Sequence, residues 1–329
     1  MPPGSPMERR VFLRRLAQTL FMAAASGALG LAFWDPRGPD GGTKRNDAFV
    51  MPDFSGGGEG ARMAIARGFD RIQGAESVIR ALGGMATFIR PGDRVLLKVN
   101  AAFASPPLLG ATTHPDMVIA VARMCFQAGA ERVMVTDNPI NDPSSCFELT
   151  GIGPAARSAG AEVILPSPDQ FRQYGLEGGQ LIQNWPLLGV PLTMADKLIG
   201  LAPVKDHHRS GASLTIKNWY GLLGGRRNLF HQRIHTIIAE LAMMMRPTLV
   251  ILDGTSSMIA NGPTGGSLDD LRETRTIIAG TDPVAVDAAG AALLGKTPQD
   301  LPHLALAEKA GAGTVDYQSL RPVKVSGPV

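Results

Sequence analysis

Cysteine is nearly absent from this sequence, which contains only Cys125 and Cys146. Two thiols are too few for an iron–sulfur cluster, which needs about four thiolate ligands. No Cys-x-x-Cys motif is present, so a dithiol redox centre of that type is excluded as well. Cys125 lies in an apolar pattern of helical spacing. Two alternatives therefore remain: the thiols pair in an oxidising compartment, or they are buried and free.

The chain also lacks an excess of charge outside its first 15 residues. Those residues hold four arginines against one glutamate, which accounts for the whole formal net charge of +3. The rest of the chain is formally neutral, whereas nucleic-acid binding depends on clustered Lys and Arg side chains that neutralise phosphates. We therefore expect no nucleic-acid partner.

The N-terminal segment 1–34 has the features of a targeting sequence. Residues 8–14 read ERRVFLR, which resembles the twin-arginine (Tat) export pattern, with Glu8 where Ser or Thr is usual. The uncharged stretch 16–34 follows and is close to the minimum length of a membrane span. We expect recognition by the twin-arginine translocase and a periplasmic or otherwise extracytoplasmic location. A retained membrane anchor through residues 16–34 is the alternative to a signal that is removed.

Beyond this segment the sequence divides into a linker, one large domain and a short tail. Residues 35–60 are rich in Gly, Pro and Asp without apolar periodicity, which is typical of a linker. Residues 61–320 alternate short β-branched runs with longer Ala-rich helical patterns. The alternation predicts an α/β fold with a mostly parallel sheet and helices on both faces, or two α/β lobes around a cleft. Residues 321–329 are expected to form a tail.

The expected elements follow from periodicity and from start signals such as Asp282-Pro283, where an N-cap precedes a first-turn proline. The strands are expected at 94–99, 132–136, 162–165, 197–202, 213–216, 248–252 and 276–278, and the helices at 61–82, 115–128, 231–245 and 283–294.

Nearly every expected strand ends in a residue that can titrate, coordinate or donate a hydrogen bond. In open α/β sheets, ligands bind at the carboxyl ends of parallel strands, because the loops converge there. These side chains are therefore expected to line one cleft, whereas the alternative for each Asp or Asn is that it caps a helix or begins a turn. The strand-end residues are Asn100, Asp137, Lys205, His207, Lys217, Asn218, Asp253 and Asp282. Lys98 is the last residue but one of the expected strand 94–99.

Two glycine-containing loops add to this set. Residues 221–225 include three glycines, with Lys217 before them and Arg226-Arg227 after them. Glycines let backbone N–H groups approach an anion, and neighbouring cations supply charge, so this loop is a candidate site for a carboxylate or a phosphate. No Walker motif is present. The second loop, which contains Gly262, is a candidate binding loop or a plain surface connection.

A divalent metal is the candidate cofactor. His231 and His235 stand four positions apart at the start of an expected helix, and Asp253 is a carboxylate that could complete the ligand set. No Glu follows the first histidine, in contrast to the zinc-protease helix. The alternative is that the two histidines belong to the surface or the core.

Several short blocks, in order along the chain, resemble the family called domain of unknown function 362. The resemblance covers roughly residues 90–315; Val99 replaces a usual proline, and the Lys205 block contains an additional His208. Many members of that family carry appended ferredoxin-type cysteine motifs, which implies a redox setting, but this chain lacks those cysteines. The blocks are KVN at 98–100, THP at 113–115, TDNP at 136–139, PVK at 203–205 with His207, IKN at 216–218, His231, DG at 253–254, NGP at 261–263, and AGTDPVAVD at 279–287.

Two functional hypotheses follow, besides that of a purely structural membrane anchor. The first is an exported enzyme or cofactor-dependent protein in which Lys205 and Lys217 hold a small anionic ligand. In it, His207 or His231 transfers a proton, and Asp253 orients the histidine or binds a metal. The second is a non-catalytic module that stores or delivers a metal or an anionic cofactor for an exported redox partner. The further residues expected to bind the ligand are Lys98, Asn100, Asp137, Asn218, Gly262 and Asp282.

Overall fold

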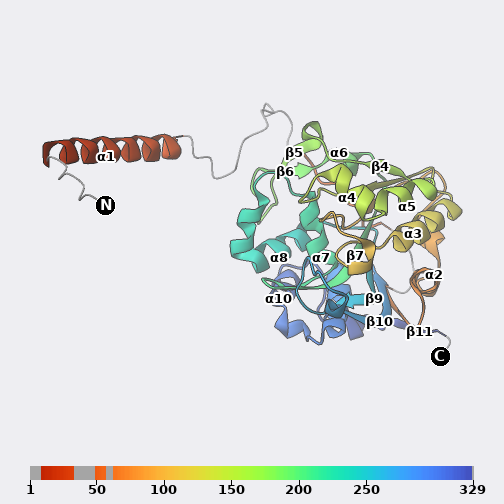
Figure 1. The fold of residues 1–329 in the computed structure, drawn as a ribbon. Helices are drawn as coiled ribbons and strands as arrows, with labels where there is room; N and C mark the ends of the chain where they lie inside the picture. The colour runs from red at the N-terminus through yellow and green to blue at the C-terminus, as the bar shows by residue number, and fades with distance from the viewer. Residues whose placement is uncertain (1–8, 33–48, 57–61, 328–329) are drawn as a thin grey trace. The chain divides into compact units, whose positions relative to one another are not determined.

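The computed structural model describes residues 9–32, 49–56 and 62–327 of the chain (Figure 1). These residues belong to two units, Met1–Gly42 and Thr43–Val329. Glu8 of the export pattern lies outside the described residues. The same is true of Trp34 and of residues 35–48 and 57–60 of the expected linker.

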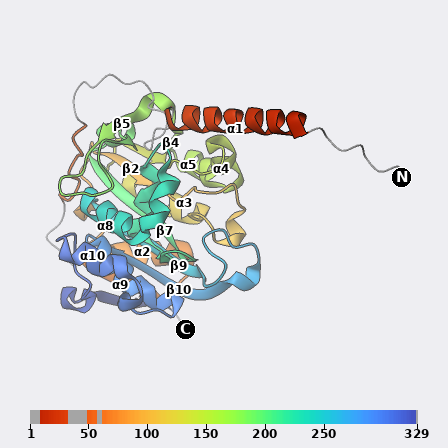
Figure 2. The same ribbon diagram turned by 90° about the vertical axis from the view of Figure 1, so that its left-hand side faces the viewer.

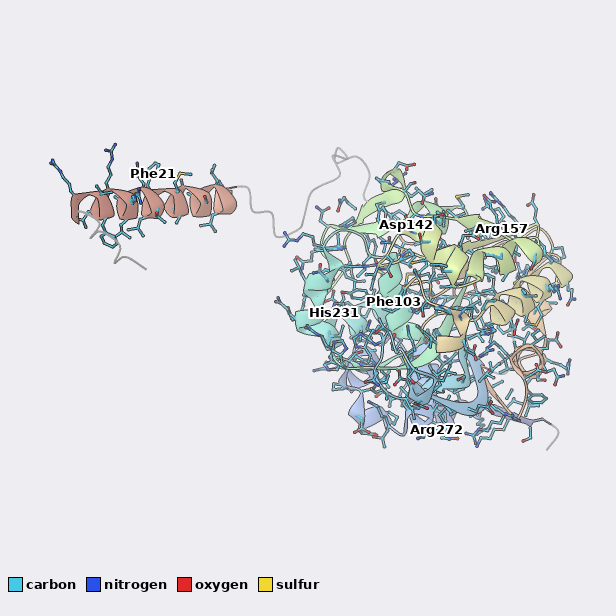
Figure 3. All side chains as sticks on the ribbon, viewed as in Figure 1. Phe21, Phe103, Asp142, Arg157, His231 and Arg272 are labelled. Carbon is cyan, nitrogen blue, oxygen red and sulfur yellow. The ribbon has the colours of Figure 1, made fainter. Side chains whose placement is uncertain are left out.

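The first unit contributes one helix, α1 (Arg9–Ala32), which spans most of the expected targeting segment. Apolar side chains lie on its surface, such as Phe21, which is 72% exposed and is labelled in Figure 3. Within the described ranges, no helix combines the length and the apolar character needed to cross a membrane.

The second unit is built on one mixed sheet in which five consecutive strands run parallel, from β9 to the edge strand β4. β10 is antiparallel to β9, and β1 and β11 extend the sheet beyond β10. β8 folds back on the end of β7, while β5 and β6 form a separate two-stranded sheet. In sheet order the strands are β11 (Val323–Ser326), β1 (Met63–Arg67), β10 (Leu271–Gly280), β9 (Leu249–Met258), β7 (Lys197–His207), β2 (Arg94–Lys98), β3 (Arg132–Thr136) and β4 (Glu162–Ile164), with β8 (Gly211–Ser213), β5 (Phe171–Tyr174) and β6 (Trp185–Leu188) outside this order.

Helices cover both faces of the sheet, because successive strand residues point to opposite sides. Leu97 and Ile251 pack in a core with helices α2, α3 and α5. Leu96 and Leu252 pack in a second core on the other face, with α7 to α10. Figure 2 shows α8, α9 and α10 gathered in one part of this unit. The helices are α2 (Arg71–Ala81), α3 (Pro115–Gln127), α4 (Pro143–Leu149), α5 (Ile152–Ser158), α6 (Val190–Thr193), α7 (Thr215–Asn218), α8 (Ile234–Met244), α9 (Pro283–Gly290) and α10 (Pro302–Lys309).

The predicted fold class, a mostly parallel sheet with helices on both faces, is confirmed. The alternative of two lobes is wrong, because residues 43–329 form a single unit. The expected tail is wrong as well, since β11 pairs in parallel with β1. Part of the expected linker also packs on the domain: Phe54 is buried, and its carbonyl accepts from the Thr248 hydroxyl.

Two segments have a different secondary structure from the one that the sequence predicted. The helix expected over 61–82 begins only at Arg71, after an Asp70 N-cap, and is preceded by β1. The Ala-rich sequence of β1 shows no strand alternation, because the strand is paired on both sides and buried on both faces. The strand expected at 213–216 is instead the end of β8 followed by α7. The first two backbone amides of α7, those of Thr215 and Ile216, donate to the Asp287 carboxylate.

The cysteine alternatives are also resolved. Cys125 and Cys146 are both buried and free. Burial raises the pKa of the Cys146 thiol to about 11 and that of Cys125 further still. Both thiols are therefore protonated and unreactive near neutral pH.

Candidate functional site

A cavity of about 540 Å³ lies beyond the carboxyl ends of β2, β3 and β7. We call it the cationic cavity. Lys98 aligns with Thr136 of β3 and Gly200 of β7, so Asn100 and Asp137 follow their strands at the same edge of the sheet. Figure 3 labels Phe103 and His231, which both line the cavity. The lining contains His231 and the predicted strand-end residues Asn100, Asp137, Lys205, His207, Lys217 and Asn218.

A buried ion pair joins Asp137 of the lining to Lys98, which does not itself line the cavity, contrary to the prediction that it binds the ligand. The Nζ atom of Lys98 is 2.7 Å from the Asp137 carboxylate, and both side chains are almost completely shielded from solvent. Burial lowers the pKa of Lys98, and the Asp137 charge opposes that shift. A Cβ atom at position 221 would lie only 2.0 Å from the same carboxylate, so Gly221 is required for the close approach of its loop. The pair is neutral as a whole and adds no net charge to the site.

Lys205 is the most buried cation of the lining, at 1% exposure. Its ammonium donates to the Ala111 carbonyl at 2.6 Å and to Oδ1 of Asn100 at 3.4 Å. Burial, reinforced by the charge of Lys217, lowers the pKa of Lys205 to about 7. Lys205 therefore exists in both protonation states near neutral pH, as an acid–base group requires.

Two further cations complete the charged lining. Lys217 lies 5.0 Å from the centroid of the Tyr220 ring, and burial lowers its pKa to about 8. The Arg227 guanidinium donates to four backbone carbonyls, which fixes its position. Lys205, Lys217 and Arg227 form no ion pair with a carboxylate in the part of the chain that the structure describes. The cavity therefore holds positive charge that the protein itself does not neutralise.

Two histidines beside these cations are held in opposite tautomers. Nδ1 of His207 accepts from the backbone amides of Arg209 and Ser210, so the neutral ring carries its proton on Nε2. Nδ1 of His231 lies 3.2 Å from the Asn228 carbonyl, which can only accept, so Nε2 of His231 is free to accept. The two rings are nearly parallel, with centroids 6.1 Å apart. Burial and the Lys217 charge lower the pKa of His207 to about 2 and also lower that of His231.

A chain of amides connects the lysines. Oδ1 of Asn218 accepts from Lys98 and from the side-chain amide of Asn100, each at 3.2 Å. The side-chain amide of Asn218 in turn donates to the carbonyls of Lys98 and Leu201. These bonds orient Asn100 so that its Oδ1 atom faces Lys205. Asn100 and Asn218 are therefore placed to position the lysines.

Asp253 does not belong to the cationic cavity, which corrects the prediction of a single cleft. It lies on β9 at the level of Pro203, on the face that carries Leu249 and Ile251. Its carboxylate is 2.6 Å from Nε of Arg71 in α2, within a separate cavity. The expected strand ended at residue 252, but β9 continues to Met258, so Asp253 lies inside the strand, where the alternation of side chains directs it to the other face.

Asp282 and Gly262 are also absent from the cavity lining. Asp282 follows β10, which is antiparallel to β9, so it lies at the opposite edge of the sheet. It caps α9 by accepting from the Ala285 amide at 3.0 Å, as its alternative interpretation predicted. Gly262 lies against Asp206, whose carbonyl oxygen would be 1.9 Å from a Cβ atom there, and its neighbour Pro263 lines the cavity.

The three candidate metal ligands are not brought together. His231 lies in a 3₁₀ segment before α8 and contacts Tyr220, whereas His235 of α8 stacks on His303. Asp253 is paired with Arg71. Over the described ranges, no three side chains of His, Cys, Asp or Glu are grouped so that they could hold a metal ion.

Sequence reasoning missed Tyr220 and undervalued Arg227. Tyr220 lines the cavity, contacts His231 and lies near Lys217, and its hydroxyl donates to the Arg227 carbonyl. Tyr220 is the aromatic residue nearest the glycine loop in the sequence, and Arg227 is one of two adjacent arginines that follow this loop. No spacing rule could identify either, because their contacts depend on the turn at 221–225.

Comparisons with known proteins agree with the residue blocks. The model of the family described as "Domain of unknown function (DUF362)" matches residues 95–292. A thylakoid-associated protein of Synechocystis sp. is 28% identical over 245 residues, which cover 71% of this chain and 73% of that protein. The structure of the lactate racemase apoprotein from Thermoanaerobacterium thermosaccharolyticum is 12% identical, with a TM-score of 0.33. That match covers 62% of this chain, and the chain spans about half of that structure, at 52%.

Proposed function

The chain belongs to the domain of unknown function (DUF362) family, and we propose from this premise that it is an exported enzyme acting on a small anion in the cationic cavity. The observation that carries the proposal is the absence of ion-pair partners for Lys205, Lys217 and Arg227 among the described residues. Buried cations without a counter-charge cost free energy, and an anionic ligand would offset that cost.

In this proposal Lys205 is the acid–base residue, rather than a histidine. Its pKa of about 7 allows it to give or take a proton at neutral pH. His207, with a pKa of about 2, stays neutral and donates a hydrogen bond from Nε2 to the anion. Lys217 and the field of Arg227 supply positive charge where negative charge develops during the reaction.

Substitution of Lys217 tests anion binding directly. We expect Lys217→Met to raise the Kd for malonate or phosphate about tenfold or more, because a neutral side chain of similar length removes one counter-charge. Isothermal titration of the full chain measures this. Lys309→Met is the matched control, because Lys309 is exposed in the last turn of α10. Equal affinities of the two variants for both anions would refute the proposed site.

A non-catalytic accessory role is the second candidate, and the state of His207 favours it. A ring held neutral by burial and by two backbone amides is suited to binding rather than to proton transfer. The two roles differ in their dependence on Lys205. Incubation of the native ligand in D₂O with wild-type and Lys205→Met chains separates them: Lys205-dependent deuterium incorporation supports the enzyme, and its absence with retained binding supports the carrier.

A further inference from the structure

A second cavity, of about 810 Å³, lies against the first turn of α2, and we call it the α2 cavity. It contains the Arg71–Asp253 ion pair described above. Its walls come from α2, β9, β10 and the segment that leads into α3. None of the residues named for the proposed anion site, other than the excluded Asp253, lines it.

Two threonines that line the α2 cavity have buried hydroxyls without a hydrogen-bond partner among the described residues. Thr112 is only 3% exposed, and its hydroxyl finds no hydrogen-bond partner among the described residues. The same holds for the buried hydroxyl of Thr255. Leaving a buried polar group unsatisfied is costly, so two such groups in one cavity indicate a ligand.

Arg71 and His114 add further donors. Nε of Arg71 is occupied by Asp253, and no hydrogen bond engages its terminal nitrogens in the described ranges. Nδ1 of His114 accepts from the Asp116 amide at 3.2 Å, so its neutral ring carries the proton on Nε2. Burial and the Arg71 charge lower the pKa of His114. The carboxylate of Asp253 is already satisfied by Arg71 and by the Thr255 amide.

The charge of the lining argues against an anion here. Four carboxylates and two arginines line the α2 cavity, which gives a formal charge of −2 with His114 neutral. The acids at its rim are exposed and hydrated, for example Glu273, whose side chain is 74% exposed. Apolar side chains are also exposed in the lining, with Leu108 at 69%, Leu268 at 55% and Ile72 at 38% exposure.

We propose that the α2 cavity is a second binding site, for an uncharged small molecule with a carbonyl-type acceptor oxygen and an apolar body. The oxygen accepts from the Thr112 hydroxyl and the terminal nitrogens of Arg71, while the apolar body contacts Leu108 and Leu268. The negative lining excludes carboxylates, which the cationic cavity favours. The two cavities thus select ligands of opposite character.

Benzamide and benzoate form a matched probe pair, because they have nearly the same shape and differ in charge. Thr112→Val is the informative variant, since it keeps the shape and removes only the hydroxyl. The side chain at position 112 must keep its shape, because a shift of the backbone there would also move the adjacent Ala111 carbonyl, which accepts from Lys205. Ligand-observed NMR titration of the full chain measures both affinities.

We expect benzamide to bind the wild-type chain more tightly than benzoate in the α2 cavity. Thr112→Val should weaken benzamide binding about tenfold, the worth of one hydrogen bond, without lowering Tm, because it removes an unsatisfied buried hydroxyl. Leu108→Ser should weaken benzamide severalfold. Lys217→Met should leave benzamide unchanged and weaken benzoate at the other cavity, so failure of the anion site and failure of this site are distinguishable.

Three outcomes overturn the proposal: no saturable benzamide binding, benzamide affinity unchanged in Thr112→Val, or benzoate preferred over benzamide when the cationic cavity is disabled by Lys217→Met. If Thr112→Val lowers Tm, Leu108→Ser provides the test instead, because Leu108 is exposed at the rim and contacts the apolar body of the ligand in this proposal. Unchanged benzamide affinity in that variant then counts against the site in the same way.

Discussion

At the scale of single residues, the protonation of Lys205 and Lys217 controls the charge of the cationic cavity. Burial lowers their pKa values to about 7 and about 8, whereas an unfolded chain holds lysine near its ordinary value of 10.5. Between these values the unfolded state binds more protons than the folded state, so stability rises with pH from about 7 to about 10. The unliganded protein is destabilised when both lysines are charged, which is the state that binds an anion.

Anion affinity should therefore fall as pH rises. We expect the Kd for malonate to increase about tenfold or more between pH 6.5 and pH 9, because Lys205 and Lys217 lose their charge in this range. Isothermal titration at several pH values in buffers of different ionisation enthalpy also reports the protons taken up on binding. An affinity that is flat over this range, with no proton uptake, would contradict the role assigned to the two lysines.

At the scale of elements, strand direction and side-chain parity decide which strand-end residues meet. β2, β3 and β7 run parallel, and their polar end residues line one cavity. β10 runs the other way, so Asp282 reaches the opposite edge, where it caps α9 and also accepts from the Thr314 amide. Asp253 is on a parallel strand but faces α2. In the linear sequence Asp253 and Asp282 resemble residues of the anion site, but in the structure neither of them lines the cationic cavity.

Asp282→Ala should lower the free energy of unfolding by about 1–2 kcal/mol, because it removes the N-cap of α9 and a loop contact. Urea denaturation measures this change. Asp282→Asn retains an acceptor oxygen and should be less destabilising. Anion affinity should stay unchanged in Asp282→Asn, and a tenfold weaker Kd there would return Asp282 to the binding site.

At the scale of the whole molecule, the N-terminal segment that we propose to be a targeting sequence and the α/β domain belong to separate units. The proposal of export rests on the ERRVFLR pattern, which is part of the sequence rather than of the domain fold. We expect Arg9→Lys together with Arg10→Lys to abolish export and to leave the folded domain and its anion affinity unchanged. Fractionation of the native host measures export. Wild-type levels of the double variant outside the cytoplasm would exclude the twin-arginine route.

The sequence by itself determined the class of the fold and most members of the site. Short β-branched runs separated by helical patterns favour a parallel sheet, and such a sheet gathers Asn100, Asp137 and Lys205 at one edge. The cap at Asp282 was also readable, because its signal is local. Elements that depend on distant partners, such as β1 and β11, were not readable, since their pairing is what makes them strands.

Only the tertiary structure decided which residues share a cavity. Whether Asp253 faced Lys205 or Arg71 depended on which residues of β9 point to each face of the sheet. A shift of β9 by a single residue relative to its neighbours would exchange the two faces. Whether the lysines had counter-charges depended on every side chain packed around them, and so did their pKa values. Burial and pairing are properties of the packed molecule, and for that reason the charge of the cationic cavity could be seen only in three dimensions.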